Sequence, residues 1–232
     1  MNLAGRVVAV TGAFGTLGGA VAQAAAACGA KVALIDRAPV PADLHAHLPG
    51  ALLLGSVELT SPDGAIDALS RVVAHYGGLD AVVNAAGAFR WEPLEEGSID
   101  TWDLLYKVNA RTAVAVSKAA LPHLLARGGG RIVNVGAAAA AKAGAGMGAY
   151  AASKAAVARL TESLADELKD RRITVNAVLP SIIDTPQNRH DMPDADFTRW
   201  VAPTAIADVI LFLISDAAAA VTGALIPVTG RT

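Results

Sequence analysis

The stretch Arg6–Gly18, RVVAVTGAFGTLG, decides the fold of this chain. A short apolar run, Arg6–Thr11, passes directly into a glycine turn, and an alanine-rich helical stretch, Thr16–Cys28, follows. Glycines permit a sharp turn and let the backbone approach a phosphate group. The free N–H groups and the dipole at the start of a helix then favour its negative charge. The stretch therefore predicts a strand, a phosphate-binding turn and a buried helix in succession.

Short apolar runs alternate with longer helical stretches along the rest of the chain. The expected strands are Arg6–Thr11, Lys31–Asp36, Ala51–Val57, Leu79–Asn84, Arg131–Val135, Ile173–Leu179 and Ala224–Val228. The expected helices are Thr16–Cys28, Pro62–Tyr76, Ile99–Arg127, Gly148–Lys169 and Thr204–Ser215, the third long enough that we expect a break. The strands lack polar alternation, which is typical of strands buried on both faces. The pattern predicts an α/β fold with a parallel sheet between helices.

Composition narrows the classes of function. The 232 residues contain no linker or repeat, so we expect one domain spanning residues 1–232. A net charge of −2 without a basic run argues against nucleic acid, and the lone Cys28 excludes an internal disulfide framework or a CxxC metal site. Val7–Ala30 has no charge, but its glycines favour strand, turn and helix over a membrane span. We expect a cytoplasmic protein with no membrane, nucleic-acid or metal partner.

An acidic residue follows the glycine turn at the spacing that is typical of dinucleotide-binding folds. The second expected strand ends at Asp36, 18 residues past Gly18. A carboxylate there can accept hydrogen bonds from the hydroxyls of an adenosine ribose and would repel the 2′-phosphate of NADP. Arg37 complicates this preference, because a guanidinium can pair with that phosphate. The sequence favours NAD over NADP.

A tyrosine and a lysine stand four residues apart in an expected helix. In Tyr150-Ala151-Ala152-Ser153-Lys154 the i, i+4 spacing places both functional side chains on one face. A lysine cation stabilises tyrosinate, so it is expected to lower the tyrosine pKa from its usual value near ~10. The pair therefore predicts a phenol that exchanges protons with a substrate.

Taken together, these motifs resemble the short-chain dehydrogenase/reductase family over essentially the whole chain. Asn84–Gly87 after the fourth strand, and Asn109 in a Lys-Val-Asn triplet, occur in the family's order and spacing. The resemblance implies a Rossmann-type doubly wound sheet of about seven parallel strands, a nicotinamide cofactor and a small-molecule substrate. Tyr150 would be the acid/base, Lys154 would hold the nicotinamide ribose, and Asn109 would anchor a proton-relaying water.

The resemblance also implies a set of cofactor-binding residues. These are Gly12, Phe14, Gly15, Thr16, Leu17, Gly18, Asp36, Arg37, Glu58, Asn84, Ala85, Ala86, Gly87, Tyr150, Lys154, Pro180, Ile183 and Thr185. Glu58 stands where the family usually has an aspartate near the adenine. Thr185 would lie near the nicotinamide carboxamide. Residues 186–203 would form a substrate loop, because a polar connection of that length is often a lid or binding loop.

Three positions depart from the family pattern. Thr16 replaces the usual second glycine of the turn, and Ser181 replaces the glycine that normally follows Pro180. The third departure is Ala137, which stands 13 residues before Tyr150, where the family usually has its catalytic serine. The hydroxyl that would share a substrate oxygen with the tyrosine is therefore missing from its strand.

Three interpretations of the function remain open at this point. An ordinary carbonyl/alcohol pair is the first. Residues 179–200 also resemble dihydropteridine reductases, which keep the Tyr/Lys pair but lack the serine, so a quinonoid dihydropterin or another C=N substrate is the second. A non-catalytic dinucleotide-binding sensor or scaffold is the third. Family members commonly pair through the helices Ile99–Arg127 and Gly148–Lys169, so the resemblance implies a homodimer or homotetramer.

Overall fold

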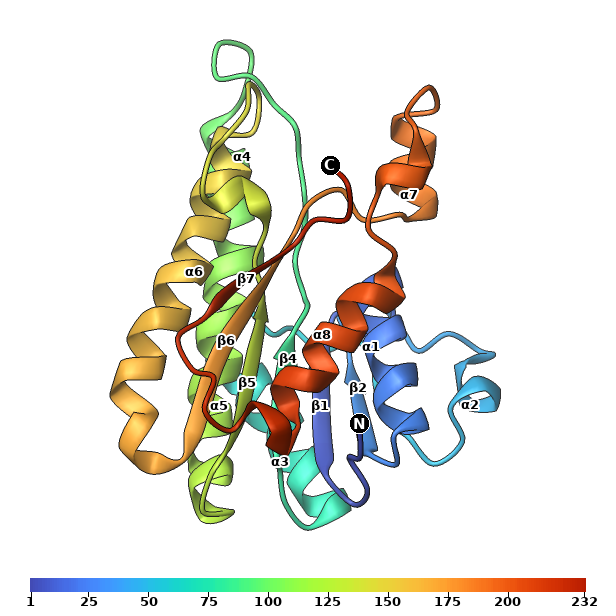
Figure 1. Cartoon of the computed structure of the whole chain (residues 1–232), viewed down its shortest axis with the longest axis vertical. Helices are drawn as coiled ribbons and strands as arrows, with labels where there is room; N and C mark the ends of the chain where they lie inside the picture. Colours follow the sequence, from blue (N-terminus) through green and yellow to red (C-terminus); the bar gives the residue numbers. More distant parts are fainter.

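Seven parallel strands form one sheet at the centre of the computed structural model, which describes all 232 residues (Figure 1). Their spatial order is β3-β2-β1-β4-β5-β6-β7. The strands are β1 (Val7–Thr11), β2 (Lys31–Ile35), β3 (Leu52–Leu54), β4 (Ala81–Asn84), β5 (Gly130–Val135), β6 (Ile173–Pro180) and β7 (Leu225–Val228). The strand order reverses between β1 and β4. A crevice at the carboxyl ends of these two strands is where such sheets bind ligands.

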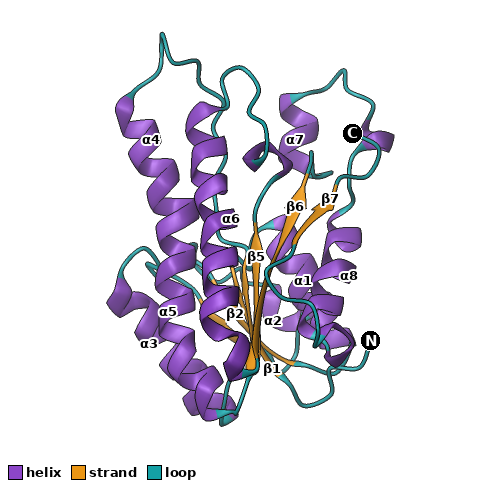
Figure 2. Ribbon diagram, turned by 60° about the vertical axis from the view of Figure 1, so that its left-hand side comes forward, coloured by secondary structure: helices purple, strands orange, loops and turns teal.

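Helices cover both faces of this sheet, which confirms the predicted doubly wound α/β fold (Figure 2). One face carries α1 (Thr16–Ala27) and α8 (Pro203–Ile214), and the other carries α3 (Pro62–Tyr76), α5 (Thr112–Ala126) and α6 (Gly148–Leu168). The shorter helices are α2 (Leu44–His47), α4 (Ile99–Leu105) and α7 (Pro186–Asp191). None of the helices combines the length and the apolar character that crossing a membrane requires.

The strands bury both of their faces because nearly every residue in them is apolar. In β1, Val8 and Val10 join the core under α1 and α8, whereas Val7 and Ala9 join the core under α3 and α5. Full burial of a valine side chain contributes roughly 1.5–3 kcal/mol. Two apolar cores of similar size therefore pack against the two faces of the sheet. The loops lie at the ends of the strands.

The third strand is shorter than the predicted run Ala51–Val57. It ends at Leu54, because Ser56 adopts a left-handed conformation with a φ of 57°. The neighbouring backbone keeps the chain in place: Asp36 N–H donates to Leu54 O at 3.0 Å, and Val57 N–H donates to Asp36 O at 3.0 Å. This turn brings the residues after Ser56 alongside Asp36.

The long helix predicted over Ile99–Arg127 is interrupted, as expected. A π-helical segment, Tyr106–Arg111, separates α4 from α5. Such segments insert an extra residue into a helix and often occur at functional sites. Asn109 lies in the middle of this one and is buried.

Residues 186–203 are more ordered than a plain loop. They begin with α7, whose N-cap Thr185 accepts a hydrogen bond from Asn188 N–H at 3.1 Å. A bidentate pair joins Asp184 to Arg189, and the Arg189 guanidinium lies 4.8 Å from the centre of the Phe197 ring. The segment is therefore a structured cover over the carboxyl edge of the sheet.

Candidate active site

Two glycines shape the turn after β1. Gly12 has a φ of 62°, and a Cβ there would lie 2.7 Å from the Cα of Ala86. A Cβ on Gly18 would overlap the carbonyl oxygen of Gly12. Gly15 differs, since the nearest atom to a Cβ there would be Gly12 O at 3.4 Å. Gly12 and Gly18 close the turn, and Gly15 leaves its outer side open.

Helix α1 begins at this open side. Its N-cap residue, Gly15, supplies no side-chain hydrogen bond, and no acidic residue lies in the first turn. The first N–H groups of an α-helix have no partner within the helix. Together with the helix dipole they form a site for an anion, so the turn fits the phosphates of a dinucleotide.

A cleft of about 640 Å³ opens from this turn along the carboxyl ends of the central strands. Its volume suits a ligand of cofactor size. Of the predicted residues it is lined by Gly12, Phe14, Gly15, Thr16, Leu17, Gly18, Asp36, Arg37, Glu58, Ala85, Ala86, Gly87 and Thr185. Lining residues that sequence reasoning missed are Ala38, Val57, Leu59, Thr60, Ala88, Leu104, Val108 and Thr112.

Asp36 is fixed at the rim of this cleft by two backbone groups. Its Oδ2 accepts from Phe14 N–H at 3.0 Å, and its Oδ1 accepts from Ala38 N–H at 2.9 Å. A carboxylate has about four acceptor sites, so acceptor capacity remains for a ligand. The glycine turn and the carboxylate are thus held together, in a geometry that fits the ribose of a dinucleotide.

Glu58 lies beyond Asp36 as an ionised group. Its pKa is below the usual range because the Thr60 hydroxyl and N–H donate to Oε1 at 2.7 and 3.0 Å. The positive charges of Lys107 and Arg37 lower the pKa further. Arg37 therefore already has an acidic neighbour at this end of the cleft.

Asn84 does not line the cleft, unlike the three residues that follow it. Its buried Nδ2 donates to Ser117 Oγ at 3.1 Å and to Asn134 Oδ1 at 2.8 Å. Asn134 donates in turn to Thr161 Oγ1 at 2.9 Å. Asn84 therefore ties β4 to its neighbours beneath the cleft, and the predicted adenosine-side lining falls to Ala85, Ala86 and Gly87.

Asn109 clamps the loop after β4 to helix α6. Its Oδ1 accepts from Ala88 N–H at 2.8 Å, while its Nδ2 donates to Ala88 O at 3.0 Å and to Ser153 Oγ at 2.9 Å. The Ser153 hydroxyl donates to the carbonyl of Tyr150 at 2.7 Å. Both amide hydrogens of Asn109 are used, so its side chain acts here as a positioning group.

Gly87 joins the cleft to the predicted catalytic residues. A Cβ on Gly87 would lie 2.7 Å from Asn109 Oδ1 and 3.3 Å from Lys154 Nζ. Lys154 is 5% exposed, and its Nζ donates to Val135 O at 2.8 Å. Tyr150 precedes it by one turn on α6. The absence of a side chain at position 87 therefore gives the cleft access to the lysine and the asparagine.

Burial governs the acidity of the Tyr150/Lys154 pair. It raises the pKa of Tyr150 to about 12 and lowers the pKa of Lys154 to about 8. The sequence predicted the opposite direction for the tyrosine. The difference arises because desolvation favours the neutral phenol, while the ammonium is directed at a backbone carbonyl. At neutral pH Tyr150 holds its proton and Lys154 is charged.

Ala137 is buried at the end of β5, immediately before a helical turn, Ala138–Ala140, that packs against α6. Ala137 therefore stands two residues past Val135, the last residue of β5, at the start of the turn that contacts α6. No hydroxyl is available from this turn, because all four residues from Ala137 to Ala140 are alanines.

The segment after β6 contributes one residue to the cleft. Thr185 lines it, whereas Pro180 ends β6 and Ile183 pairs with Val201. Ser181, the other departure in this segment, donates its hydroxyl to Thr229 O at 2.8 Å. The serine is therefore accommodated by the C-terminal residues.

Aromatic side chains stand beside Tyr150. The Phe89 ring meets the Tyr150 ring edge to face, with centroids 4.9 Å apart, and Phe89 is 56% exposed. Trp91 is also exposed and donates its Nε1–H to Ala145 O at 2.9 Å.

Comparisons with known proteins agree with this geometry. The family model for short chain dehydrogenases matches residues 6–196. The chain is 33% identical to the 3-oxoacyl-(acyl-carrier-protein) reductase FabG of Vibrio cholerae, over 99% of this chain and 98% of that protein. A short-chain type dehydrogenase/reductase from Mycobacterium ulcerans superposes with a TM-score of 0.91 at 27% identity, covering 100% of this chain and 90% of the other.

A second solved structure was determined with a cofactor. Carveol dehydrogenase from Mycobacterium avium, in complex with NAD, superposes with a TM-score of 0.89 at 27% identity, over 99% of this chain and 98% of that one. Matches of this extent show that essentially the whole chain shares the fold of these proteins. The chain therefore belongs to the short-chain dehydrogenase family and is an NAD(P)-dependent oxidoreductase.

Proposed function

We propose that this enzyme moves a hydride between NAD(H) and a small alcohol or carbonyl substrate, with Tyr150 as the acid/base. The observation that carries this proposal is the position of Gly87, which brings the nucleotide cleft against Asn109 and Lys154. A bound nicotinamide cofactor supplies or accepts the hydride. The chain's own task is to place the substrate oxygen and to move one proton.

Tyr150 is the proton donor in the direction of reduction. Its raised pKa keeps the phenol protonated at neutral pH, so a proton is available for an oxygen that gains charge. The buried Lys154 ammonium is the charge that stabilises the phenolate afterwards, and the Val135 carbonyl holds it in place. Asn109 positions the Tyr150 backbone through Ser153 and the loop after β4 through Ala88, a role we propose in place of side-chain anchoring of a water.

We further propose that NAD is preferred over NADP. Asp36 presents a carboxylate that Phe14 N–H and Ala38 N–H hold in a fixed orientation, and this group would repel a 2′-phosphate. Arg37 is the residue that would favour NADP. Its charge already interacts with Glu58, which weakens that opposing contribution.

Residues 186–203 are proposed as the substrate loop, and a homodimer or homotetramer as the assembly. The loop follows Thr185 directly and is held by the Asp184–Arg189 pair. For the assembly, the support is the apolar surface of α4 and the segment after it, where Ile99, Trp102 and Tyr106 are exposed. The size of the assembly follows from sedimentation or light scattering.

The missing serine bears on the choice of substrate. The matched proteins are named as an oxoacyl reductase and a carveol dehydrogenase, so the comparisons do not favour a quinonoid dihydropterin or a sensor role. With Ala137 in the serine position, Tyr150 alone meets the substrate oxygen. We therefore expect a ketone reductase whose rate is limited by that missing donor.

The test is Ala137→Ser, assayed by NADH consumption with one activated ketone and one quinonoid dihydropterin. A donor aimed at a developing oxyanion is worth about 2.7–4 kcal/mol, so we expect ketone turnover to rise by about 10²-fold. Ala139→Ser, two residues further along the same turn, is the matched control and should change nothing. If the wild type turns over the dihydropterin rapidly and Ala137→Ser slows this reaction, the substrate is a C=N compound. If the protein binds the cofactor but turns over neither compound, it is a sensor.

A further inference from the structure

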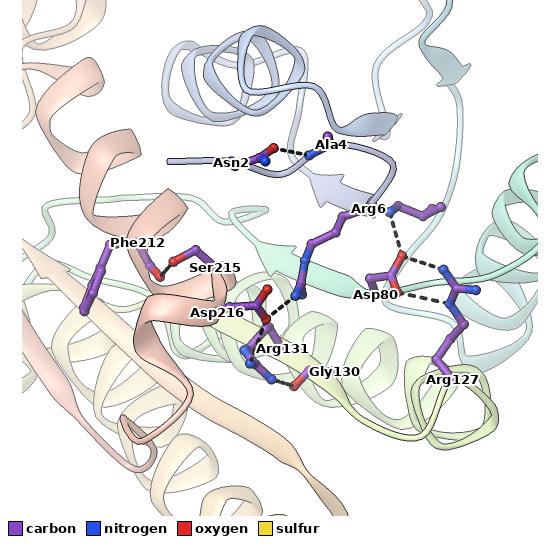
Figure 3. Close-up of polar contacts among 11 residues, drawn as sticks. Asn2, Ala4, Arg6, Asp80, Arg127, Gly130, Arg131, Phe212, Ser215 and Asp216 are labelled. Carbon is purple, nitrogen blue, oxygen red and sulfur yellow. Dashed lines mark hydrogen bonds and ion pairs between the residues drawn. The ribbon is translucent and has the colours of Figure 1, made fainter.

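A second cleft lies at the opposite edge of the sheet, where the strands begin (Figure 3). It has a volume of about 360 Å³, and no hydrophobic side chain lines it. Its charged residues are Arg6, Asp80, Arg127, Arg131, Arg172 and Asp216, joined by the backbone of residues 128–130. Arg6 and Asp80 directly precede β1 and β4, and Arg172 precedes β6. We name this the arginine cleft.

Four arginines face two aspartates in the arginine cleft. Asp80 pairs with Arg127, whose Nε donates to Asp80 Oδ1 at 3.0 Å and whose Nη2 donates to Asp80 Oδ2 at 3.1 Å. Asp216 contacts Arg6 closely, and its Oδ1 is 3.8 Å from Arg131 Nη2, beyond hydrogen-bond reach. Arg172 makes no ion pair at all. Two guanidinium charges therefore lack a full partner.

Arg131 is the more constrained of these two arginines. Its side chain is only 11% exposed, and its Nη1 donates to the neighbouring Gly130 O at 3.1 Å. Its Nε is buried and has no acceptor. Burial, and then the charge of Arg6, hold its pKa below the usual value. The Nη2 group has no acceptor within hydrogen-bond distance, since Asp216 Oδ1 lies 3.8 Å away, so Nη2 is the donor that Arg131 offers to a ligand in the cleft.

Arg172 reaches the cleft at a backbone cost. Its φ is 56°, in the left-handed region where a non-glycine residue is uncommon. The backbone has its own reason for this shape, since the Arg172 carbonyl accepts from Gly130 N–H at 3.1 Å. Glycine would satisfy that need without strain. An arginine therefore stands where a glycine would relieve the strain, and its guanidinium has no ion-pair partner within the protein.

We propose that the arginine cleft binds a phosphate group, of free phosphate or of a phosphomonoester. Planar guanidinium groups match the oxygens of phosphate bidentately, and in this cleft Arg131 Nη2 and the Arg172 guanidinium have no acceptor within hydrogen-bond distance. The backbone N–H groups of residues 128–130 are bonded internally, so the arginine side chains make the site. The strands between the two edges are about 17 Å long, so this site is separate from the cofactor cleft.

The experiment is calorimetric titration of the whole enzyme with inorganic phosphate, at an ionic strength held constant with chloride. The wild type should bind saturably, and Arg172→Gly should bind about tenfold more weakly while its Tm stays the same or rises. Arg131→Gln should weaken binding similarly. Asp216→Asn should strengthen it, because it removes a carboxylate that competes for the guanidiniums. Arg159→Gln, an exposed arginine outside the cleft, is the matched control.

Two further arms identify the source and the location. Phenyl phosphate binding as tightly as phosphate shows that the group alone is recognised, and tighter binding points to a phosphomonoester. If NADH abolishes phosphate binding, and Arg131→Gln and Arg172→Gly leave that binding unchanged, the phosphate binds at the glycine turn. That result overturns the proposal. A wild type that binds polyglutamate but not phosphate overturns it as well.

Discussion

The two edges of the sheet meet their surroundings by different means, although the same parallel strands end at both. At the carboxyl edge the backbone is left free: Gly15 is open, and the first N–H groups of α1 have no partner. At the amino edge the glycine backbone is already satisfied, because Gly128 N–H and Gly129 N–H donate to Leu125 O and Leu124 O at 2.9 and 3.1 Å. The groups that remain available to a ligand at the amino edge are charged side chains.

The two edges can therefore support different chemistry. A site made of backbone groups and small residues has a fixed shape and admits few titrating groups, so a single phenol and a single ammonium can dominate it. A site made of flexible guanidiniums tolerates more substitution, and each of its members contributes less. Substitutions at the carboxyl edge should therefore have the larger effects.

The largest effect should come from removing the phenol of Tyr150 at the carboxyl edge. Tyr150→Phe removes the proton donor but keeps the ring that meets Phe89, so we expect kcat to fall by ~10²–10⁴-fold. The NADH dissociation constant, measured by fluorescence titration, should stay within about threefold. Tyr106→Phe, at an exposed tyrosine, is the control and should keep wild-type turnover. A Tyr150→Phe enzyme with wild-type kcat would remove the acid/base role.

The buried ammonium of Lys154 should make the free energy of unfolding depend on pH. The pKa of Lys154 falls from 10.5 to about 8 on folding, so between these values the unfolded chain binds more protons than the native one. Stability should therefore rise across this interval, by about 3 kcal/mol at most. In Lys154→Met this rise should be absent, whereas the loss above pH 10 from the raised pKa of Tyr150 should remain. Urea unfolding from pH 7 to 10 measures the difference, and parallel curves for the two proteins would contradict it.

At the amino edge the largest single contribution should come from Asp80. Its carboxylate accepts from Val7 N–H at 2.8 Å and holds Arg127 bidentately. Asp80→Asn keeps one acceptor and loses the charge, so we expect unfolding free energy to drop by about 1–3 kcal/mol with kcat unchanged. Asp67→Asn is the control, because its exposed pair with Arg71 is worth about 0.5 kcal/mol or less. Lost turnover in Asp80→Asn would show that the edges are coupled.

The smallest effect should be on cofactor choice. Asp36→Ala removes the carboxylate at the cleft rim, and we expect the ratio of the NADP and NAD dissociation constants to fall by about tenfold, or about 1.4 kcal/mol. The ratio is the appropriate measure, because the substitution also frees Phe14 N–H and Ala38 N–H and so lowers affinity for both cofactors. An unchanged ratio would transfer the selectivity to Arg37.

Local pattern was enough to predict the sheet but not its irregular parts. Unbroken apolar runs such as Val7–Val10 bury both faces, which only a layered parallel sheet allows. The early end of β3 at Leu54 could not be predicted, because it depends on backbone bonds between Val57 and Asp36, far apart in sequence. The break in Ile99–Arg127 was predictable from length, whereas its π-helical form was not.

The candidate site divides in the same way. Residues of the glycine turn, together with Asp36 and Tyr150, belong to local motifs, so the sequence could propose them. The burial of Asn84 and the direction of the Tyr150 pKa could not be predicted, because both depend on packing, which only the folded structure determines. The arginine cleft left no signal, because Arg6, Arg131 and Arg172 come together only after folding.

The π-helical segment sets the phase of the long helix on either side of it. An α-helix turns about 100° per residue, so deletion of one residue from Tyr106–Arg111 would rotate everything after it by that angle. Either Val116 and Leu124 would leave the core, or Leu105 would. The extra residue lets both ends of the helix keep their buried faces while Asn109 turns toward Ala88. The π-helical segment thus meets two requirements at once, the buried faces of α4 and α5 and the contact of Asn109 with the loop after β4.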